Sequence, residues 1–226
     1  MAPLKRTSLV DQLYDQLKNN IITLTYPLGS KLNVNELQEI FGVSSTPLRE
    51  AITRLQAEGL VDYENNVGAR VVSLSAKDIQ DIQDLALTLH SAAVRLAMER
   101  GDRARVAEDV ALYVKGYQNA KTGVAKIKNI FDLIGSFYRH SGNTRLDNNM
   151  KVIQGQQLIL RYLYYGYLGI EGAHTDQYEK IGQAAKAGDA GRIIELLTEN
   201  YDQATPILIK ALDDFTKKHP PDKSLK

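Results

Sequence analysis

The sequence has no cysteine among its 226 residues. Disulfide bonds and thiolate metal sites are therefore excluded, and a reducing compartment is the expected location. It also has no run of about 18 apolar residues that could span a bilayer, and its first residues contain no apolar secretory core. These absences predict a cytoplasmic protein without a membrane segment.

An excess of charge of either sign is also missing. The formal net charge is +1, and residues 1–75 carry 7 Lys and Arg against 8 Asp and Glu. Because a DNA-binding domain usually presents a basic surface, charge gives no support for a nucleic-acid partner. Such a function must rest on motif geometry. What is present is the composition of an ordinary soluble globular protein, 43% hydrophobic and 24% charged.

The sequence divides into two consecutive regions that differ in their secondary-structure patterns. Up to about residue 75, short helical patterns precede two β-like runs, and from there on helix follows helix with Gly or Asn between them. We predict a mainly α fold. Residues 1–74 form a winged helix-turn-helix with a small β-hairpin wing, residues 75–219 an all-α helical bundle domain, and residues 220–226 a flexible tail.

Two short helices open the first region. Leucines and isoleucines at helical spacing predict the first helix at about 8–23, and a Pro-x-Gly turn ends it. The capping pair of Asn33 and Glu36 starts the second helix, which ends at Gly42.

A third helix follows a tight turn and carries the candidate DNA contacts. Ser44 or Ser45 caps it. Ser44, Ser45 and Thr46 lie where free backbone N–H groups and the positive end of the helix dipole favour phosphate. Arg49, one turn further along, can reach a guanine edge or hold a phosphate.

A β-hairpin completes the motif. The runs LVDYE and ARVVSL flank a turn at 65–68, where Gly68 is expected to adopt a positive φ. We expect this wing loop, with Asn66 and Gly68, to lie across the DNA backbone or in the minor groove. Many helical hairpins share a bare helix-turn-helix spacing, so spacing alone leaves a role without DNA open.

The same stretch resembles a known family. The residues that carry the resemblance are Pro27-x-Gly29, Glu36-Leu37, Gly42-Val43-Ser44, Thr46 to Ala51, Leu55, Glu58-Gly59-Leu60 and Gly68-x-Arg70-Val71. Residues 9–72 thereby resemble the DNA-binding domain of the GntR family. The resemblance implies a transcription regulator, by family default a repressor, that binds a short palindromic double-stranded operator as a homodimer.

Two positions depart from the family pattern. Asn35 and Ser45 stand where family members commonly carry arginines that touch DNA. We expect the loss of two cations to weaken non-specific binding and to alter base preference, while both positions stay candidate contacts.

Six helices are predicted in the second region. Their approximate bounds are 76–100, 103–121, 125–141, 143–169, 175–187 and 190–217, the first capped by Ser75 and Asp78. The motifs at 140–143 (His-Ser-Gly-Asn) and 184–189 resemble the helical C-terminal domain of the FadR subgroup (the FCD domain). The resemblance implies dimer contacts and a pocket for a small-molecule effector.

Many members of that subgroup hold a divalent metal with one Asp and three His. Alignment at the Ser-Gly-Asn turn puts the Asp and the first His position at Ile130 and Ile134. Counting from Gly188-Asp189 puts the other two His positions at Tyr178 and Asn200. Isoleucine has no donor atom, and the other two are weak ligands. A gap of two residues would bring Asp132 into place, but still no histidine. We therefore predict no metal and no other cofactor.

Without a metal, an effector needs direct partners. Ile130 and Ile134 would make one corner of the pocket apolar, which suits an organic or acyl-type ligand. Arg161, Tyr178 and Asn200 are the candidate polar partners. The alternative, that the two isoleucines are ordinary core and the pocket is filled, stays open.

Tyrosines and histidines of this region receive structural assignments. For the cluster of Tyr162, Tyr164, Tyr165 and Tyr167, core or dimer packing is favoured over ligand stacking, and both stay open. The four histidines show no i, i+4 pair and are assigned surface or capping roles. They are His90, His140, His174 and His219.

Three functions are compared. The first is a ligand-responsive DNA-binding regulator that acts as a homodimer. The second is a ligand-independent DNA-binding protein whose helical domain only dimerises. The third, an enzyme, is disfavoured because the sequence shows no nucleophile with a base, no Gly-rich phosphate loop and no metal constellation.

Overall fold

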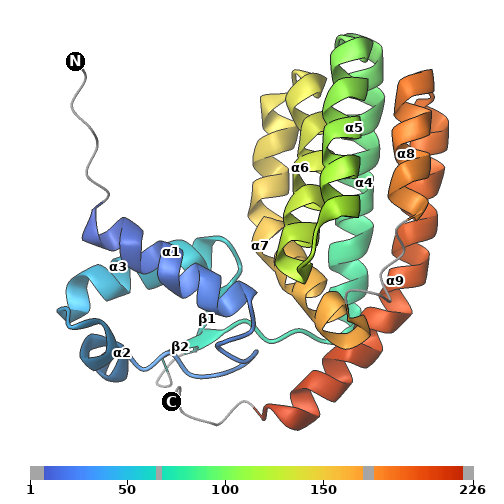
Figure 1. Ribbon diagram of the computed structural model, residues 1–226. Helices are drawn as coiled ribbons and strands as arrows, with labels where there is room; N and C mark the ends of the chain where they lie inside the picture. Colours follow the sequence, from blue (N-terminus) through green and yellow to red (C-terminus); the bar gives the residue numbers. More distant parts are fainter. Residues whose placement is uncertain (1–7, 65–67, 170–175, 221–226) are drawn as a thin grey trace, which may run out of the picture. The chain divides into compact units, whose positions relative to one another are not determined.

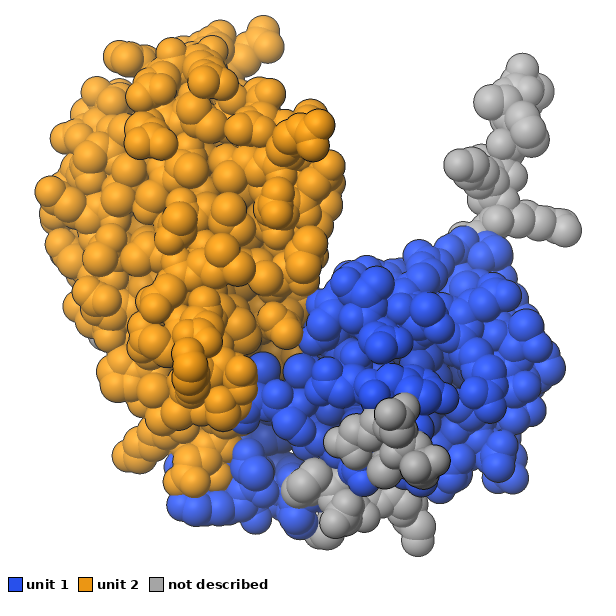
Figure 2. Space-filling model, turned by 180° about the vertical axis from the view of Figure 1, so that it is seen from behind, with its two compact units in different colours: residues 1–74, 214–226 blue, residues 75–213 orange. Residues whose placement is uncertain are grey.

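The computed structural model describes residues 8–64, 68–169 and 176–220. Two compact units are present, residues 1–74 with 214–226, and residues 75–213; Figure 2 shows them in two colours. The elements of the first unit, labelled in Figure 1, are α1 (Leu9–Ile22), α2 (Val34–Phe41), α3 (Ser45–Ala57), β1 (Val61–Glu64) and β2 (Gly68–Val71). Those that follow are α4 (Ala76–Arg100), α5 (Arg103–Asn119), α6 (Gly123–Ser141), α7 (Thr144–Leu168), α8 (Asp176–Ala187) and α9 (Ala190–Lys218).

Helix α1 is the first helix of this unit and packs against α3. A reciprocal capping box starts it, since the Ser8 side chain accepts from the Asp11 amide and the Asp11 carboxylate accepts from the Ser8 amide. Its apolar face, with Leu13, Leu17 and Ile21 buried, packs against α3.

The helix-turn-helix depends on one glycine. Gly42 ends α2 at a φ of 65°, a left-handed conformation that is costly for any residue with a Cβ. The Asn33 side chain accepts from the Asn35 amide at the start of α2. Glu36 accepts from the Asn33 side chain rather than from its backbone, so the predicted pair caps the helix without forming a full capping box.

The wing is a two-stranded antiparallel hairpin. Its register runs from Val61 opposite Val71 to Glu64 opposite Gly68, and Gly68 has the expected positive φ of 98°. An isolated bridge between Lys31 and Arg70 adds the segment before α2 to this edge.

Helices α4 to α9 build the second compact unit around one core. Contacts join α4 to α6 and α7, α5 to α6 and α8, and α6 to α7 (Figure 1). Tyr117 and Phe137 are the largest of the fully buried side chains. The predicted Ser75–Asp78 capping box is present at the start of α4. None of the helices within the described ranges combines the length and apolar character that a bilayer crossing requires.

The predicted fold class is confirmed, and the differences lie at the ends of helices. α5 stops at Asn119 because Ala120 is extended, and α6 begins earlier than predicted because Thr122 caps it. The end of α9 from Asp214 groups with the first unit, whereas the sequence pattern assigned it to the helical domain. Of the predicted tail, only Pro220 lies within the described residues.

Candidate nucleic-acid interface and effector cavities

Six of the seven predicted DNA contacts lie in the described part of the first unit. Asn35, Ser44, Thr46 and Arg49 are exposed, and Ser45 and Gly68 are partly exposed. The seventh residue, Asn66, lies outside the described residues.

A groove brings part of this set together. It runs between the start of α2, the exposed face of α3 and the hairpin, and Asn35, Arg49 and Gly68 all line it. Thr46 lies on the other side of α3, where a second groove along α1 is lined by Thr46 and again by Arg49. Arg49 therefore stands on the ridge between the two grooves.

The N-terminus of α3 is open to an anion. Ser44 is its N-cap residue, but the hydroxyl makes no capping hydrogen bond, and the first turn holds no acidic residue. The amide groups of the first turn have no intrahelical partners and carry the positive end of the helix dipole. A DNA phosphate would satisfy them.

Three basic side chains of this unit form ion pairs or hydrogen bonds within it. Lys18 pairs with Glu58 at 2.5 Å, Arg54 pairs with Asp11 at 2.8 Å, and Arg70 donates to the Gly29 carbonyl. Burial alone would lower the pKa of Lys18, and hydrogen bonds to Glu58 and to the Tyr14 hydroxyl more than offset it. The two ion pairs connect α1 to α3. All three contacts leave fewer basic side chains for DNA.

Two cations are left over. Among residues 8–64 and 68–74, Lys31 and Arg49 are the basic side chains that form no ion pair or hydrogen bond. Both line the same groove. The basic patch that the composition fails to reveal is thus a local one.

Among the lining residues that sequence reasoning did not single out as DNA contacts are Lys31 and Tyr63. Tyr63 is an exposed aromatic side chain on β1, and it faces the groove together with Lys31. The signal for Lys31 was available, because it is the only Lys or Arg between Lys18 and Arg49.

Comparison with known proteins agrees with this geometry. Residues 9–71 match the model of the family described as bacterial regulatory proteins, gntR family. Residues 9–71 are therefore similar to the DNA-binding domain of that family.

The curated proteins that this chain resembles fall into two groups. An uncharacterized HTH-type transcriptional regulator of Bacillus subtilis, YdhC, is 36% identical over 98 residues, which covers 43% of this chain and 44% of that protein. The HTH-type transcriptional repressor GlaR of Escherichia coli is 28% identical over 212 residues, covering 88% and 95%. The more similar match thus spans less than half of its relative.

Solved structures extend the likeness in fold. E. coli McbR/YncC has a TM-score of 0.75 at 21% identity, covering 91% of this chain and 99% of that one. A putative GntR transcriptional regulator from Rhodococcus sp. RHA1 has a TM-score of 0.70 at 21% identity, covering 89% and 98%. At this identity the likeness concerns the fold alone.

The helical unit contains two neighbouring cavities. The first, here called the tyrosine cavity, offers about 40 Å³ to the centres of water molecules. Five tyrosines line it: Tyr117, Tyr164, Tyr165, Tyr178 and Tyr201. The second, the isoleucine cavity, offers about 110 Å³ and is lined by Ile130, Phe131, Ile134 and Met150 among others. Arg161 and Gln157 line both cavities.

All five predicted effector residues line this pair of cavities. Tyr178 and Asn200 lie in the tyrosine cavity, Ile130 and Ile134 in the isoleucine cavity, and Arg161 in both. The two isoleucines are buried core residues and also line the isoleucine cavity. Among the described residues, no group of three or more His, Cys, Asp or Glu side chains could hold a metal ion.

Two buried polar atoms lie unsatisfied here. Arg161 Nε and Tyr201 Oη have no partner in hydrogen-bond geometry, although the guanidinium lies close enough to the Tyr178 and Tyr201 hydroxyls to interact with them. Burial alone would lower the pKa of Arg161, but Tyr178 and the other tyrosines around it raise it overall, so the guanidinium stays charged. Buried donors of this kind require an explanation, because native proteins leave few of them unpaired.

The tyrosine cluster divides between core and cavity. The Tyr165 and Tyr117 hydroxyls lie 3.0 Å apart, and Tyr165 packs edge-on against Tyr164. Tyr162 packs partly buried against the core, and Tyr167 is exposed.

His90 is not a surface residue, and that prediction was wrong. It is buried, and its Nδ1 lies 2.9 Å from the Tyr138 hydroxyl. Burial, and secondly the charge of Arg161, lower its pKa to about 3, so the ring is neutral. The signal was its helical spacing from the buried Ala86 and Ala93, which places it on the core face of α4.

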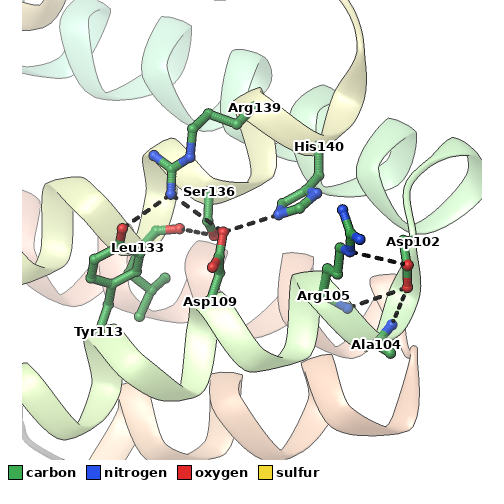
Figure 3. Close-up of polar contacts among 9 residues, drawn as sticks. All are labelled: Asp102, Ala104, Arg105, Asp109, Tyr113, Leu133, Ser136, Arg139 and His140. Carbon is green, nitrogen blue, oxygen red and sulfur yellow. Dashed lines mark hydrogen bonds and ion pairs between the residues drawn. The ribbon is translucent and has the colours of Figure 1, made fainter.

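The other described histidines have the expected kind of role. His140 Nε2 lies 3.0 Å from an Asp109 carboxylate oxygen, which also meets Arg139 at 3.6 Å and so links α5 to α6 (Figure 3). His219 stacks on Phe215 near the end of α9. His174 lies outside the described residues.

Proposed function

We propose that this chain is a cytoplasmic transcription repressor. It binds a short palindromic operator as a homodimer, and a small-molecule effector changes that binding. One observation carries the DNA part. Lys31 and Arg49, which form no ion pair or hydrogen bond among residues 8–64 and 68–74, line one groove beside the uncapped start of α3. Several relatives are named repressors, among them GlaR and the gluconate operon repressor of Bacillus licheniformis.

Each residue has a distinct proposed role. Arg49, on the exposed face of α3, reads a base edge, because its fork of donors matches guanine. Lys31, Ser44, Ser45 and Thr46 contact phosphates, which fix the register without reading sequence.

Asn35, with Asn66 and Gly68 of the wing, supplies further contacts with either the bases or the backbone. Asparagine at position 35 brings an amide where a cation is common in the family, so its contribution to affinity is less dependent on salt.

The helical domain supplies dimer contacts and binds the effector at the paired cavities. The effector acts by binding one arrangement of the dimer better than the other, and so changes operator affinity. A ligand-independent regulator is the second candidate, which the small volume of the tyrosine cavity favours. No catalytic activity is proposed.

The test is operator selection from a random duplex pool with wild type, Arg49→Ala and Lys31→Ala. Arg49→Ala should cost about 1–3 kcal/mol per half-site and relax base preference, because a base contact is lost. Lys31→Ala should weaken binding equally on all sequences. It should also reduce the steepness with which the logarithm of the binding constant falls against the logarithm of the salt concentration, by about 1 per half-site. Arg105→Ala, an exposed arginine of the helical unit, is the control and should change neither property.

The outcomes separate the parts of the proposal. A selected palindrome supports a dimer, which sedimentation at the same concentration should detect. If wild type enriches no sequence, or if Arg49→Ala enriches the same sequence as strongly, base reading by Arg49 is wrong.

A further inference from the structure

We infer that the paired cavities bind a small carboxylate with an apolar tail, its carboxylate at Arg161 and Tyr201 and its tail against Ile130 and Ile134. The inference rests on the proposed function for its biological meaning, because it names the chemistry of the effector. The site itself rests on the contacts of the helical unit alone.

The first step is the charge of Arg161. Among the described residues no Asp or Glu forms an ion pair with it, and its Nε is buried without an acceptor. A buried cation without a partner is costly, so a bound anion would relieve the site. A guanidinium offers two parallel donors, which a carboxylate accepts with both oxygens.

The second step is the supply of neutral donors beside that charge. Burial raises the pKa of Tyr117 and of Tyr201 to about 12, so both phenols keep their protons at physiological pH. The Tyr201 hydroxyl has no partner, whereas Tyr117 and Tyr165 bond to each other. Tyr201 can therefore donate to the anion that Arg161 holds.

No other group of the cavities provides the missing negative charge. His90 is neutral and engaged with Tyr138. Asp147 lines the isoleucine cavity, but it pairs with Lys151 at 2.7 Å. The cavity pair thus keeps one positive charge that the described residues do not compensate.

The third step is shape. The Arg161 guanidinium lies 5.8 Å from the Phe131 ring, at the boundary between the two cavities. A dry cavity of about 150 Å³ holds benzene, so the 110 Å³ of the isoleucine cavity suits a tail of about four to six carbons. An anionic group at Arg161 would direct that tail towards Ile130, Ile134 and Met150.

The experiment is calorimetric titration of the full chain with acetate, hexanoate and hexanamide. Hexanoate should bind at least about tenfold more tightly than acetate, because its tail buries more methylene groups. It should also bind at least about tenfold more tightly than hexanamide, which has the same shape without the charge.

Variants assign the anion to its partners. Arg161→Met should weaken hexanoate binding by about 10- to 100-fold and hexanamide binding by a smaller factor, because the neutral amide loses hydrogen-bond donors but no opposite charge. Tyr201→Phe removes a single hydroxyl and should weaken hexanoate binding by about 3- to 10-fold, which keeps the test valid if Arg161→Met does not fold. Arg192→Met, an exposed arginine of α9, is the matched control and should bind as wild type does.

Two results would overturn the inference. Equal binding of hexanoate and hexanamide would mean that the site recognises a carbonyl rather than a charge. No binding of either would mean that the space is filled by water and that Arg161 is silent. If hexanoate binds without changing operator affinity, the anion site stands and the proposed effector response fails.

Discussion

The two candidate sites of this protein are built in opposite ways. The DNA groove collects residues 31–69, close in sequence, on the exposed side of two short helices and a hairpin. The candidate effector cavities collect residues 83–208 from six helices, and most of these residues are buried. In the first site Lys31 and Arg49 face solvent, and in the second Arg161 lies among packed helices without an acidic partner in the described residues. In an exposed site, single residues can therefore be substituted without disturbing the packing of the core. In a buried site, the lining residues also pack the core, so a substitution affects stability as well.

The strongest test of that contrast is a cavity in the helical core. Phe137 is fully buried in α6, so Phe137→Ala should destabilise the helical unit by about 3–5 kcal/mol. Leu112→Ala, on the exposed side of α5, should change stability by less than about 0.5 kcal/mol. Urea unfolding followed by circular dichroism measures both. A loss below about 1 kcal/mol for Phe137→Ala would show that the core around the cavities is loosely packed.

A second test uses pH. His90 is neutral in the folded protein because its pKa falls to about 3, whereas the unfolded chain takes up a proton near pH 6.5. The stability of the helical unit is therefore complete above about pH 6.5 and falls as the pH decreases towards 3. Between pH 6.5 and 5 the loss should be about 2 kcal/mol, and His90→Gln should abolish it.

The first unit should respond at lower pH. A hydrogen bond from Arg54, with further bonds from Ser8, lowers the pKa of Asp11. This contribution is present above the unfolded value of about 3.9 and is lost as the pH falls below it. Thermal melts at pH 7, 5 and 3.5 would separate the two responses. An unfolding curve of the His90→Gln variant that still weakens between pH 6.5 and 5 would assign the effect to another group.

The smallest effect concerns the turn of the helix-turn-helix. Gly42→Ala places a Cβ at a φ of 65°, with no neighbour within 4 Å, so the cost is backbone strain alone. It should destabilise the first unit by about 1–2 kcal/mol. The control Gly166→Ala, in α7 with equally open surroundings, should be neutral or stabilise by up to about 1 kcal/mol. Equal effects of the two substitutions in chemical denaturation would contradict the special role of Gly42.

Much of the fold could be predicted from local patterns. The capping box at Ser75, the glycine turn at Gly42 and the hairpin were readable, because caps, turns and periodic burial depend on residues a few positions apart. The helix ends at Ala120 and Thr122 were less readable, since competing caps lay within a few residues of one another.

The sequence by itself determined the helix-turn-helix, the helical domain and which residue types could meet a phosphate or an effector. Only the tertiary structure decided which of them have partners. Glu58 pairs with Lys18, which is 40 positions away in the sequence, whereas Lys31 and Arg49 line the groove. Likewise, packing of six helices buries His90 and leaves Arg161 Nε without an acceptor. The physical reason is that periodicity encodes which face is buried, whereas the partner of a charge depends on distant helices that meet only in the folded chain.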